Sequence, residues 1–276
     1  MIISQITNGF GNNLFQCVAG KLLADYHNTA HYFLPEVNDY ECSVYLTKLG
    51  FKIFNKNSLE SPIIVNDQHY PLLFEERFKG KNIILKGYFE NKDFYEKHRS
   101  GLIEWFPKVQ KNNCEDLVFH FRTGDRLFYK NEFSSKPSPK QIKKAIDSFN
   151  FKRLHIVTDM PEWKKHDVES LSKLKFHVKV KKESAVDANQ AVAYFNECFA
   201  ELAEYDPIVV KRNVLQDFDF IRSFDKILFQ HGTMSWWASF LSDASRIGVY
   251  GPWRPWKGNS NKNLSEVSLN TWFKWE

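Results

Sequence analysis

The sequence predicts an α/β fold, and three observations support this prediction. The chain opens with a strand, a glycine turn and a helix, which follow one another over residues 1–6, 7–12 and 13–26. Strands and helices alternate again through the second half, as in successive strand–helix units. Finally, 276 residues with 43% hydrophobic content are enough to form the cores of two domains.

The first half has fewer clear elements than the second. The expected strands are 32–34, 63–65 and 83–89, and the expected helices are 44–50, which a glycine stops, and 93–106, which Pro107 closes. A polar stretch over residues 108–116 follows. We place the boundary there, so the predicted domains comprise residues 1–110 and 111–276.

The second half alternates more regularly. The expected strands are 117–122, 153–157, 176–180, 226–230 and 247–250, and the expected helices are 140–149, 187–201, 217–224 and 234–241, the last one after a turn at 231–233. Trp272 and Trp275 lie in a C-terminal tail that we expect to pack back on the body of this domain.

Composition limits the classes of function. The net charge of +5, over 38 basic and 33 acidic residues, permits a phosphate-bearing ligand or nucleic acid but indicates neither. The aromatic content of 16% suits bulky cores and also surfaces on which sugars or bases stack. The cysteines have no spacing typical of a zinc site, and we expect reduced, buried thiols at Cys17, Cys42, Cys114 and Cys198.

No membrane segment or leader peptide is expected. Residues 1–6 lack the basic start of a signal peptide. No apolar run approaches the ~20 residues that a membrane span needs. These features predict a soluble, cytoplasmic protein.

Arg122 has the most informative position in the sequence. It continues the alternation of a buried strand until Gly124 and Asp125 break the pattern. Ligands of open α/β sheets bind at the carboxyl ends of strands, so its guanidinium can point into such a crevice. The alternative is an ordinary strand end that carries an Arg–Asp pair.

The N-terminal glycine loop is rich in amides. Asn8, Asn12, Asn13 and Gln16 crowd the turn and the predicted helix start, together with Gly9 and Gly11. The glycines can bind phosphate or serve only the tight turn, since a third glycine and the acidic residue of a dinucleotide site are absent. The amides can cap the helix or line a polar cleft.

Four segments resemble the bacterial α-1,2-fucosyltransferases. NGFGNNLFQ at 8–16 resembles the family's GGLGNQMFQ, and GYFENKDF at 87–94 resembles GYFQSxKYF. HFRTGD at 120–125 is similar to HxRRGD, and TMSWWA at 233–238 is similar to the TFSWWA/G part of STFSWWA/G. The segments occur in the family's order across nearly the whole chain.

This resemblance implies a GT-B architecture, in which two Rossmann-like domains face each other across a cleft. It implies an inverting glycosyltransferase that needs no metal or other cofactor and transfers L-fucose from the donor GDP-fucose to a glycan acceptor, forming an α-1,2 link to galactose. Such a reaction builds charge on a departing diphosphate. Arg122 offers a permanently charged, bidentate fork that suits phosphate.

The resemblance also implies which residues form the site. Arg122 would be catalytic, and Asn12 or Asn8 would orient the acceptor hydroxyl beside Gly9, Gly11 and Asn13. The segment 231–235, where a strand runs into a helix start, would receive phosphate oxygens through its N–H groups and the hydroxyls of Thr233 and Ser235. The full set of donor-binding residues would be His120, Gly124, Asp125, Arg126, Thr158, Asp159, Asp217, His231, Gly232, Thr233, Met234 and Ser235.

Two of these acidic residues have alternative explanations. Asp159 can bind the nucleoside or the sugar, or it can simply form a turn. Asp125 has a structural explanation as the partner of the Arg122 loop, because a carboxylate beside an arginine stays ionised and is a weak base.

The sequence departs from the family in the expected donor site. Thr123 replaces the second arginine of the signature, Arg126 replaces a tyrosine, and His231-Gly232 replaces Asn-Ser. These changes leave the identity of the nucleotide sugar open. Arg126 would add a further phosphate contact.

The segment Asp217-Phe-Asp219 has the DxD form of metal-dependent glycosyltransferases. Here it opens a predicted helix, where carboxylates interact favourably with the helix dipole. We therefore expect no metal at this position.

Two other functions stay open. The basic runs at 140–144 and 179–182 would suit a phage-type enzyme that transfers a sugar, for example from a UDP-sugar, to hydroxymethylated bases of DNA. A carbohydrate-binding protein without activity is the other alternative, although it would not need a phosphate site.

Overall fold

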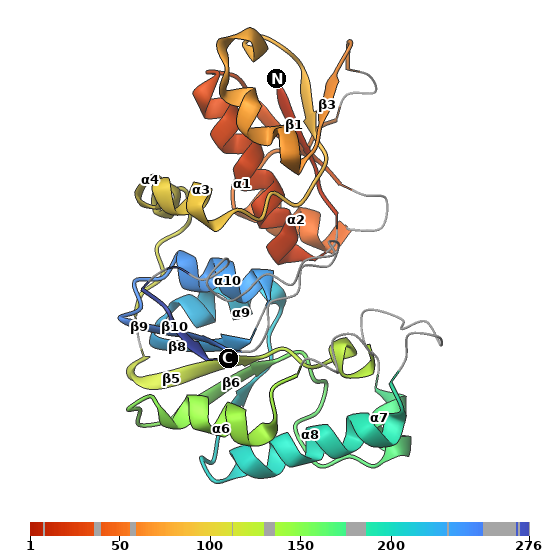
Figure 1. The fold of residues 1–276 in the computed structure, drawn as a ribbon, viewed down its shortest axis with the longest axis vertical. Helices are drawn as coiled ribbons and strands as arrows, with labels where there is room; N and C mark the ends of the chain where they lie inside the picture. Colours follow the sequence, from red (N-terminus) through yellow and green to blue (C-terminus); the bar gives the residue numbers. More distant parts are fainter. Residues whose placement is uncertain are drawn as a thin grey trace. The chain divides into compact units, whose positions relative to one another are not determined.

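The computed structural model describes residues 1–7, 9–35, 40–55, 59–111, 113–129, 136–174, 186–230, 232–250, 269 and 271–275. Internal contacts divide the chain into two compact units, Met1–Pro107 (unit 1) and Lys108–Glu276 (unit 2). This division falls close to the boundary that the polar stretch predicts. Both units combine helices with a parallel sheet (Figure 1).

Unit 1 contains a parallel sheet with the strand order β2-β1-β4-β3 in its described part. The strands are β1 (Ile2–Gln5), β2 (His31–Leu34), β3 (Ile63–Val65) and β4 (Ile83–Leu85). The helices are α1 (Phe10–Tyr26), α2 (Tyr40–Lys48), α3 (Lys92–Lys97) and α4 (Arg99–Trp105), and the 3-10 helices are η1 (Asp67–Phe74) and η2 (Glu76–Phe78). Its core lies between α1, the strands and the aromatic side chains of η1.

Several expected elements of unit 1 have other bounds in the structure, among them α2, which begins at Tyr40 instead of Val44. Helix α1 begins at Phe10, because the N–H groups of Asn12 and Asn13 already donate to the Gly9 carbonyl. Strand β4 ends at Leu85, since side chains from three other elements bind the backbone over 87–89. The helix expected at 93–106 is two helices that meet at His98.

Unit 2 contains a parallel sheet with the order β10-β9-β8-β5-β6-β7 in its described part. Its strands are β5 (Asn113–Phe121), β6 (Leu154–Thr158), β7 (Ile208–Val210), β8 (Phe224–Gln230), β9 (Arg246–Tyr250) and β10 (Phe273–Trp275). Its helices are η3 (Asp125–Phe128), α6 (Pro139–Asp147), α7 (Val168–Lys173), α8 (Ala188–Ala203), α9 (Val214–Arg222) and α10 (Thr233–Phe240). Counted from β5, this is the 3-2-1-4-5-6 order of a Rossmann sheet.

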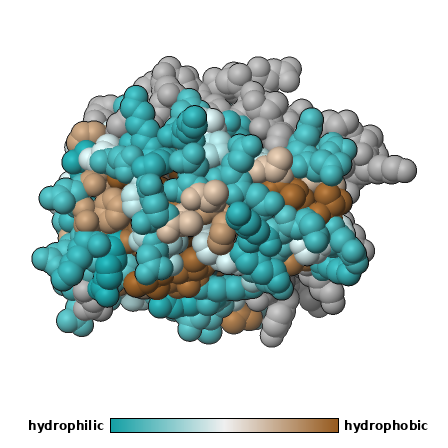
Figure 2. Space-filling view, turned by 90° about the horizontal axis from the view of Figure 1, so that it is seen from below, coloured by the Kyte–Doolittle hydropathy of each residue, from teal (hydrophilic) through white to brown (hydrophobic). Residues whose placement is uncertain are grey.

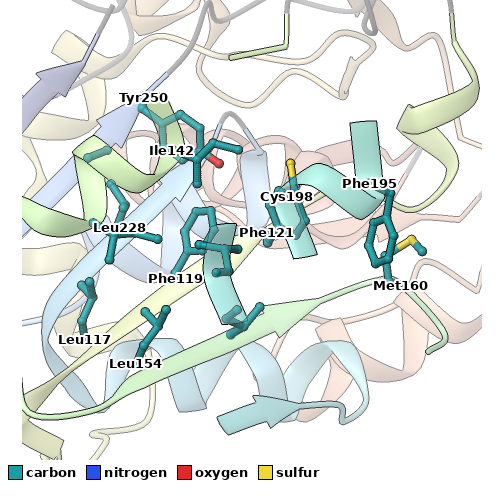
Figure 3. Packing of buried hydrophobic residues seen from close by; sticks show 14 of the residues in the cluster. Leu117, Phe119, Phe121, Ile142, Leu154, Met160, Phe195, Cys198, Leu228 and Tyr250 are labelled. Atoms are coloured by element: carbon teal, nitrogen blue, oxygen red, sulfur yellow. The ribbon is translucent and has the colours of Figure 1, made fainter. Parts of the chain in front are cut away.

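Alternation along β5 assigns its side chains to the two faces of the sheet. Leu117, Phe119 and Phe121 pack with residues of α6 and α8 in one buried cluster (Figure 3). Because successive residues of a strand point to opposite faces, His120 points to the other face. Figure 1 shows α9 and α10 on that second face.

Each sheet contains a point at which the direction of winding reverses. In unit 2 the chain moves from β5 through β6 to β7, and then returns to place β8 on the other side of β5. In unit 1, β2 and β4 likewise lie on opposite sides of β1. Ligands of doubly wound sheets bind at the carboxyl ends of the strands that flank such a point. These are β5 and β8 in unit 2, and β1 and β4 in unit 1.

The C-terminal tail packs on unit 2, as expected for Trp272. This residue is buried, and β10 pairs in parallel with β9. The strand expected at 176–180 lies outside the described residues.

Hydrophilic side chains cover much of the lower face of unit 2. Figure 2 shows them interspersed with smaller hydrophobic patches. Among the described residues, no helix has the length and apolar character required to cross a membrane.

Candidate functional site

Arg122 follows β5 directly, at the point where the winding of unit 2 reverses. Its Nη1 donates to Oδ2 of Asp159, which follows β6. The side chains are 32% and 18% exposed, respectively. The guanidinium is therefore held by a partner and still reaches the solvent at the carboxyl edge of the sheet.

Asp159 also fixes the turn after β5. Its Oδ1 accepts hydrogen bonds from the backbone N–H of Thr123, at 2.9 Å, and of Gly124, at 2.8 Å. Thr158, which precedes it, is buried, and its Oγ1 accepts from the N–H of Met160 at 3.1 Å. One carboxylate thus sets both the backbone of the turn and the orientation of Arg122.

The ionisation of Asp159 depends on these same groups. Burial alone would raise the pKa of its carboxyl, but the charge of Arg122 and the hydrogen bonds from the N–H groups of Gly124 and Thr123 outweigh burial and lower the pKa. The carboxylate is therefore ionised at neutral pH. Asp159 and Arg122 therefore form an ion pair at neutral pH.

Gly124 is required by the close approach of Asp159. A Cβ at position 124 would lie 2.4 Å from Oδ2 of Asp159, whose carboxylate is held by three donors. We expect Gly124→Ala to displace the carboxylate and to destabilise the protein by about 1–3 kcal/mol. Urea unfolding measures this loss, and a stability equal to that of the wild type would contradict the described packing.

His120 and Ser235 join β5 to α10 instead of facing the open edge. The Ser235 hydroxyl contacts Nδ1 of His120, and both side chains are buried. Burial lowers the pKa of His120 to about 4, with Arg122 and Arg126 acting in the same direction and Asp159 opposing them. A neutral histidine and a buried hydroxyl position the helix. The expectations that Ser235 receives phosphate oxygens and that His120 binds the donor stay predictions, which this burial does not favour.

The N-terminus of α10 remains suited to an anion. Thr233 is its first residue, and Thr233 and Met234 are both partly exposed, as is Gly232 before them. N–H groups in the first turn of a helix have no partner within the helix and attract negative charge. His231, expected to bind the donor, lies outside the described residues.

The tryptophans of the same motif anchor α10. Trp236 stacks on Phe240 with ring centroids 4.8 Å apart and contacts Trp237 and Trp272 edge-on. Trp236 and Trp237 are both buried. The motif therefore fixes the start of α10 against the sheet.

Two further donor-site predictions, Arg126 and Asp125, fall on the 3-10 helix η3. Arg126 is 9% exposed, so little of its guanidinium is available for the additional phosphate contact expected there. The side chain of Asp125 lies outside the described part of the chain. The partner that the structure describes for the Arg122 turn is Asp159.

Asp217 lies in the first turn of α9, which begins shortly after β7 ends at the carboxyl edge. Its Oδ1 is buried and has no hydrogen-bond partner among the described residues. Burial raises the pKa of Asp217 to about 7, and the charge of Arg212 opposes this shift. Asp219 pairs with Arg222 at 2.9 Å, so the two acids of the DxD segment have different surroundings.

The buried carboxyl of Asp217 is expected to cost stability. The unfolded chain ionises near the usual pKa of about 3.9, whereas the folded protein retains the proton to about pH 7. Stability contributed by the protonated form is therefore lost as the pH rises through this window. We expect Asp217→Asn to be more stable than the wild type by roughly 1–3 kcal/mol above pH ~7.5 and equally stable near pH ~4. Urea unfolding at both pH values tests this, and a less stable variant at the higher pH would refute it.

The amide-rich residues of unit 1 lie mostly inside α1. Gly11, Asn12 and Asn13 belong to its first turn and not to a loop, Gly11 and Asn13 are buried, and Gly9 before them is exposed. The Nδ2 of Asn13 donates to the Thr7 carbonyl at 3.0 Å, so this residue supports the turn. Asn12 is partly exposed, and Asn8 lies outside the described residues.

No known protein-family model matches this chain. No curated protein matches it either. Among solved structures, it is similar to the iron-containing dodecameric glycosyltransferase TibC from enterotoxigenic E. coli H10407, with a TM-score of 0.36 and 9% identity over 90% of this chain and 57% of that chain. The chain thus spans less than two thirds of the TibC chain. A similarity this weak shows neither a family nor an activity.

Sequence reasoning gave Gln16 only the general roles of an amide at a helix start, and it did not predict one pairing in unit 2. Gln16 connects two loops at the carboxyl edge of the unit 1 sheet. Its place one turn after Asn12 and Asn13, at the end of an amide-rich segment, was the available signal. The pairing of Arg122 with Asp159 joins residues far apart in sequence, and no local pattern predicts it.

Proposed function

We propose that this protein is an inverting glycosyltransferase that transfers L-fucose from GDP-fucose to a hydroxyl of a galactose-containing glycan. The observation that carries the proposal is the position of Arg122. It follows β5 at the reversal point of a Rossmann sheet, with its guanidinium held by Asp159. Nucleotides bind at this place in such sheets.

The chemistry of glycosyl transfer fits the two positive groups at this edge. As the bond between the sugar and the diphosphate breaks, charge builds on the departing β-phosphate. Arg122 offers a fixed, always charged fork, and the first N–H groups of α10 offer hydrogen bonds and a favourable dipole. Preorganised groups of this kind stabilise the leaving group without help from a metal.

Asp217 supports a guanine nucleotide as the donor. Its carboxyl lies at the same edge of the sheet, and Oδ1 has no hydrogen-bond partner among the described residues. The adjacent N1–H and N2–H groups of guanine are donors that one carboxylate accepts together. Uracil presents a single N–H in its place, so a UDP-sugar would use Asp217 less well.

The proposal also places the acceptor, and it assigns the acceptor to unit 1. The resemblance of its glycine–asparagine segment to the fucosyltransferases assigns the orientation of the acceptor hydroxyl to Asn12, and the GT-B arrangement is part of the same proposal. The bond from the acceptor oxygen to C1 of fucose would form on the face opposite the departing phosphate, with inversion of configuration. The bond from C1 to the phosphate oxygen would break at the same time, and the departing GDP would take up the proton of the acceptor hydroxyl.

The reaction itself tests the proposal. Purified protein, GDP-fucose and lactose are incubated with and without excess EDTA, and the products are identified by mass spectrometry and NMR. We expect GDP and a fucosylated lactose with an α-1,2 link, at the same rate with and without EDTA. Transfer from a UDP-sugar instead would reject the assigned donor.

Among the described residues, no observation favours the DNA-modifying alternative. Of the basic runs that suggested it, 140–144 lies on α6, where Lys143 pairs with Asp147 and Glu204. The second run, 179–182, lies outside the described residues.

A further inference from the structure

Three polar side chains from separate elements hold the stretch that follows β4 in unit 1. The Nε2 of Gln16 donates to the carbonyl of Gly87 at 2.9 Å. Oδ1 of Asp67 accepts from the N–H of Phe89 at 2.9 Å, and the Tyr95 hydroxyl donates to the Phe89 carbonyl at 2.8 Å. The stretch therefore has a fixed conformation, although it is a connection between a strand and a helix.

The backbone of this stretch is strained. Phe89 is buried with a φ of 56°, in the left-handed region that residues other than glycine rarely occupy. A Cβ at position 87 would lie 2.0 Å from Oδ1 of Asp67, so the packing requires Gly87. Backbone strain of ~1–3 kcal/mol persists where the surroundings fix it, and such places are frequently ligand sites.

Gln16 extends the arrangement to the loop that follows β1. Its Oε1 accepts from the N–H of Thr7 at 3.0 Å and from Nδ2 of Asn13 at 3.2 Å. Its Nε2 donates to Oγ1 of Thr7 at 3.3 Å in addition to the Gly87 carbonyl. The side chain amide is buried and uses both of its donors and two acceptor positions. One amide thus sets the distance between the two loops.

The two connected loops flank the reversal point of the unit 1 sheet. They follow β1 and β4, which are neighbours in parallel. This edge is where a ligand of unit 1 is expected to bind. The buried contacts of Gln16 mean that both sides of such a site are held in place before a ligand arrives.

We infer that the loops after β1 and β4 together bind the acceptor sugar and that Gln16 is the positioning residue that sets their spacing. This inference rests on the proposed function, because it assigns the acceptor of that reaction to these loops. The groups at this edge include backbone amides and carbonyls, the hydroxyl of Thr7 and the amide of Asn12. Neutral donors and acceptors of this kind suit the hydroxyls of an uncharged sugar.

The substitution Gln16→Glu keeps the hydrogen bonds to the loop after β1 and removes the one to the loop after β4. Ionised carboxylate oxygens still accept from Thr7 and Asn13, but they repel the Gly87 carbonyl, to which the amide donated. A matched control is Asn82→Asp, which makes the same chemical change where Nδ2 donates to the Glu60 carbonyl at 3.1 Å. Asn82 precedes β4, at the opposite edge of the same sheet.

The test is NMR of the full chain labelled with ¹⁵N-glycine and titrated with lactose and, separately, with GDP. We expect lactose to shift the Gly9 and Gly87 signals in the wild type and in the Asn82→Asp variant. In Gln16→Glu the apparent Kd for lactose should rise about tenfold or more, and acidification, which lets the protonated carboxyl donate to Gly87 again, should reverse part of this loss.

Two outcomes would overturn the inference: lactose shifts that leave Gly9 and Gly87 unchanged in the wild type, or an unchanged lactose affinity in Gln16→Glu. The GDP titration tests the donor site of the proposed function separately from the acceptor site. GDP should shift the Gly124 and Gly232 signals equally in all three proteins, and their failure to respond to GDP would refute the donor site independently of Gln16.

Discussion

Replacing Arg122 by alanine is expected to lower the rate of fucose transfer by about 10²–10³-fold, because it removes the charge that meets the departing phosphate. Arg122→Lys should recover only part of this loss, since an ammonium keeps the charge but cannot form the planar fork. Initial rates of GDP release with GDP-fucose and lactose measure both effects. Undiminished transfer by Arg122→Ala would eliminate this residue from the mechanism.

Arg153→Lys is the matched control for these variants. Arg153 pairs with Asp116 at 2.9 Å just before β6, so it forms a similar ion pair at the amino edge of the same sheet. Ligands bind at the other edge. We expect this variant to transfer fucose at the wild-type rate.

The second large effect is expected at Asp159. Asp159→Ala removes the acceptor of three donors at once and leaves Arg122 and the N–H groups of Thr123 and Gly124 without it. We expect a loss of about 2–4 kcal/mol in the free energy of unfolding and a fall in kcat/KM of the order of that in Arg122→Ala. Urea unfolding and initial rates measure the two quantities.

Asp159→Asn tests the charge of Asp159 separately from its hydrogen bonds to the turn after β5. Its amide oxygen can still accept from Thr123 and Gly124, whereas the ion pair between Arg122 and residue 159 is lost. The lowered pKa of Asp159 gives stability that is present above the unfolded value of about 3.9 and is lost as the pH falls through the folded value. The stability advantage of the wild type over Asp159→Asn should therefore be constant near neutral pH and shrink below pH ~4. An advantage that grows on acidification would contradict the ion pair.

Much of unit 2 could be predicted because its strands have strong local signals. The run begins with three apolar residues, Leu117–Phe119, and then alternates through His120 and Phe121. Both the strand and the position of Arg122 at its end therefore follow from the sequence. The pairing of Arg122 with Asp159 could not be predicted in the same way. It depends on which strand lies beside β5, and local patterns do not contain the order of strands in a sheet.

The contact between His120 and Ser235 could not be predicted for a related reason. A serine at a helix start suits a phosphate, and only the packing of α10 against β5 shows that its hydroxyl contacts a buried histidine. In unit 1, the end of β4 depends on Gln16, Asp67 and Tyr95, which bind its continuation from elsewhere in the chain. The propensity of residues 83–89 for a strand was overridden by these contacts.

Isothermal titration calorimetry with GDP and UDP, with and without EDTA, tests the central claim most directly, because it asks whether the edge with Arg122 and Asp159 binds a guanine nucleotide. We expect GDP to bind to the wild type at least about tenfold more tightly than UDP, without dependence on EDTA, and to lose most of its affinity in Arg122→Ala but not in Arg153→Lys. Equal binding of GDP to the wild type and Arg122→Ala would contradict the account, and preference for UDP would show that Asp217 does not select the donor base.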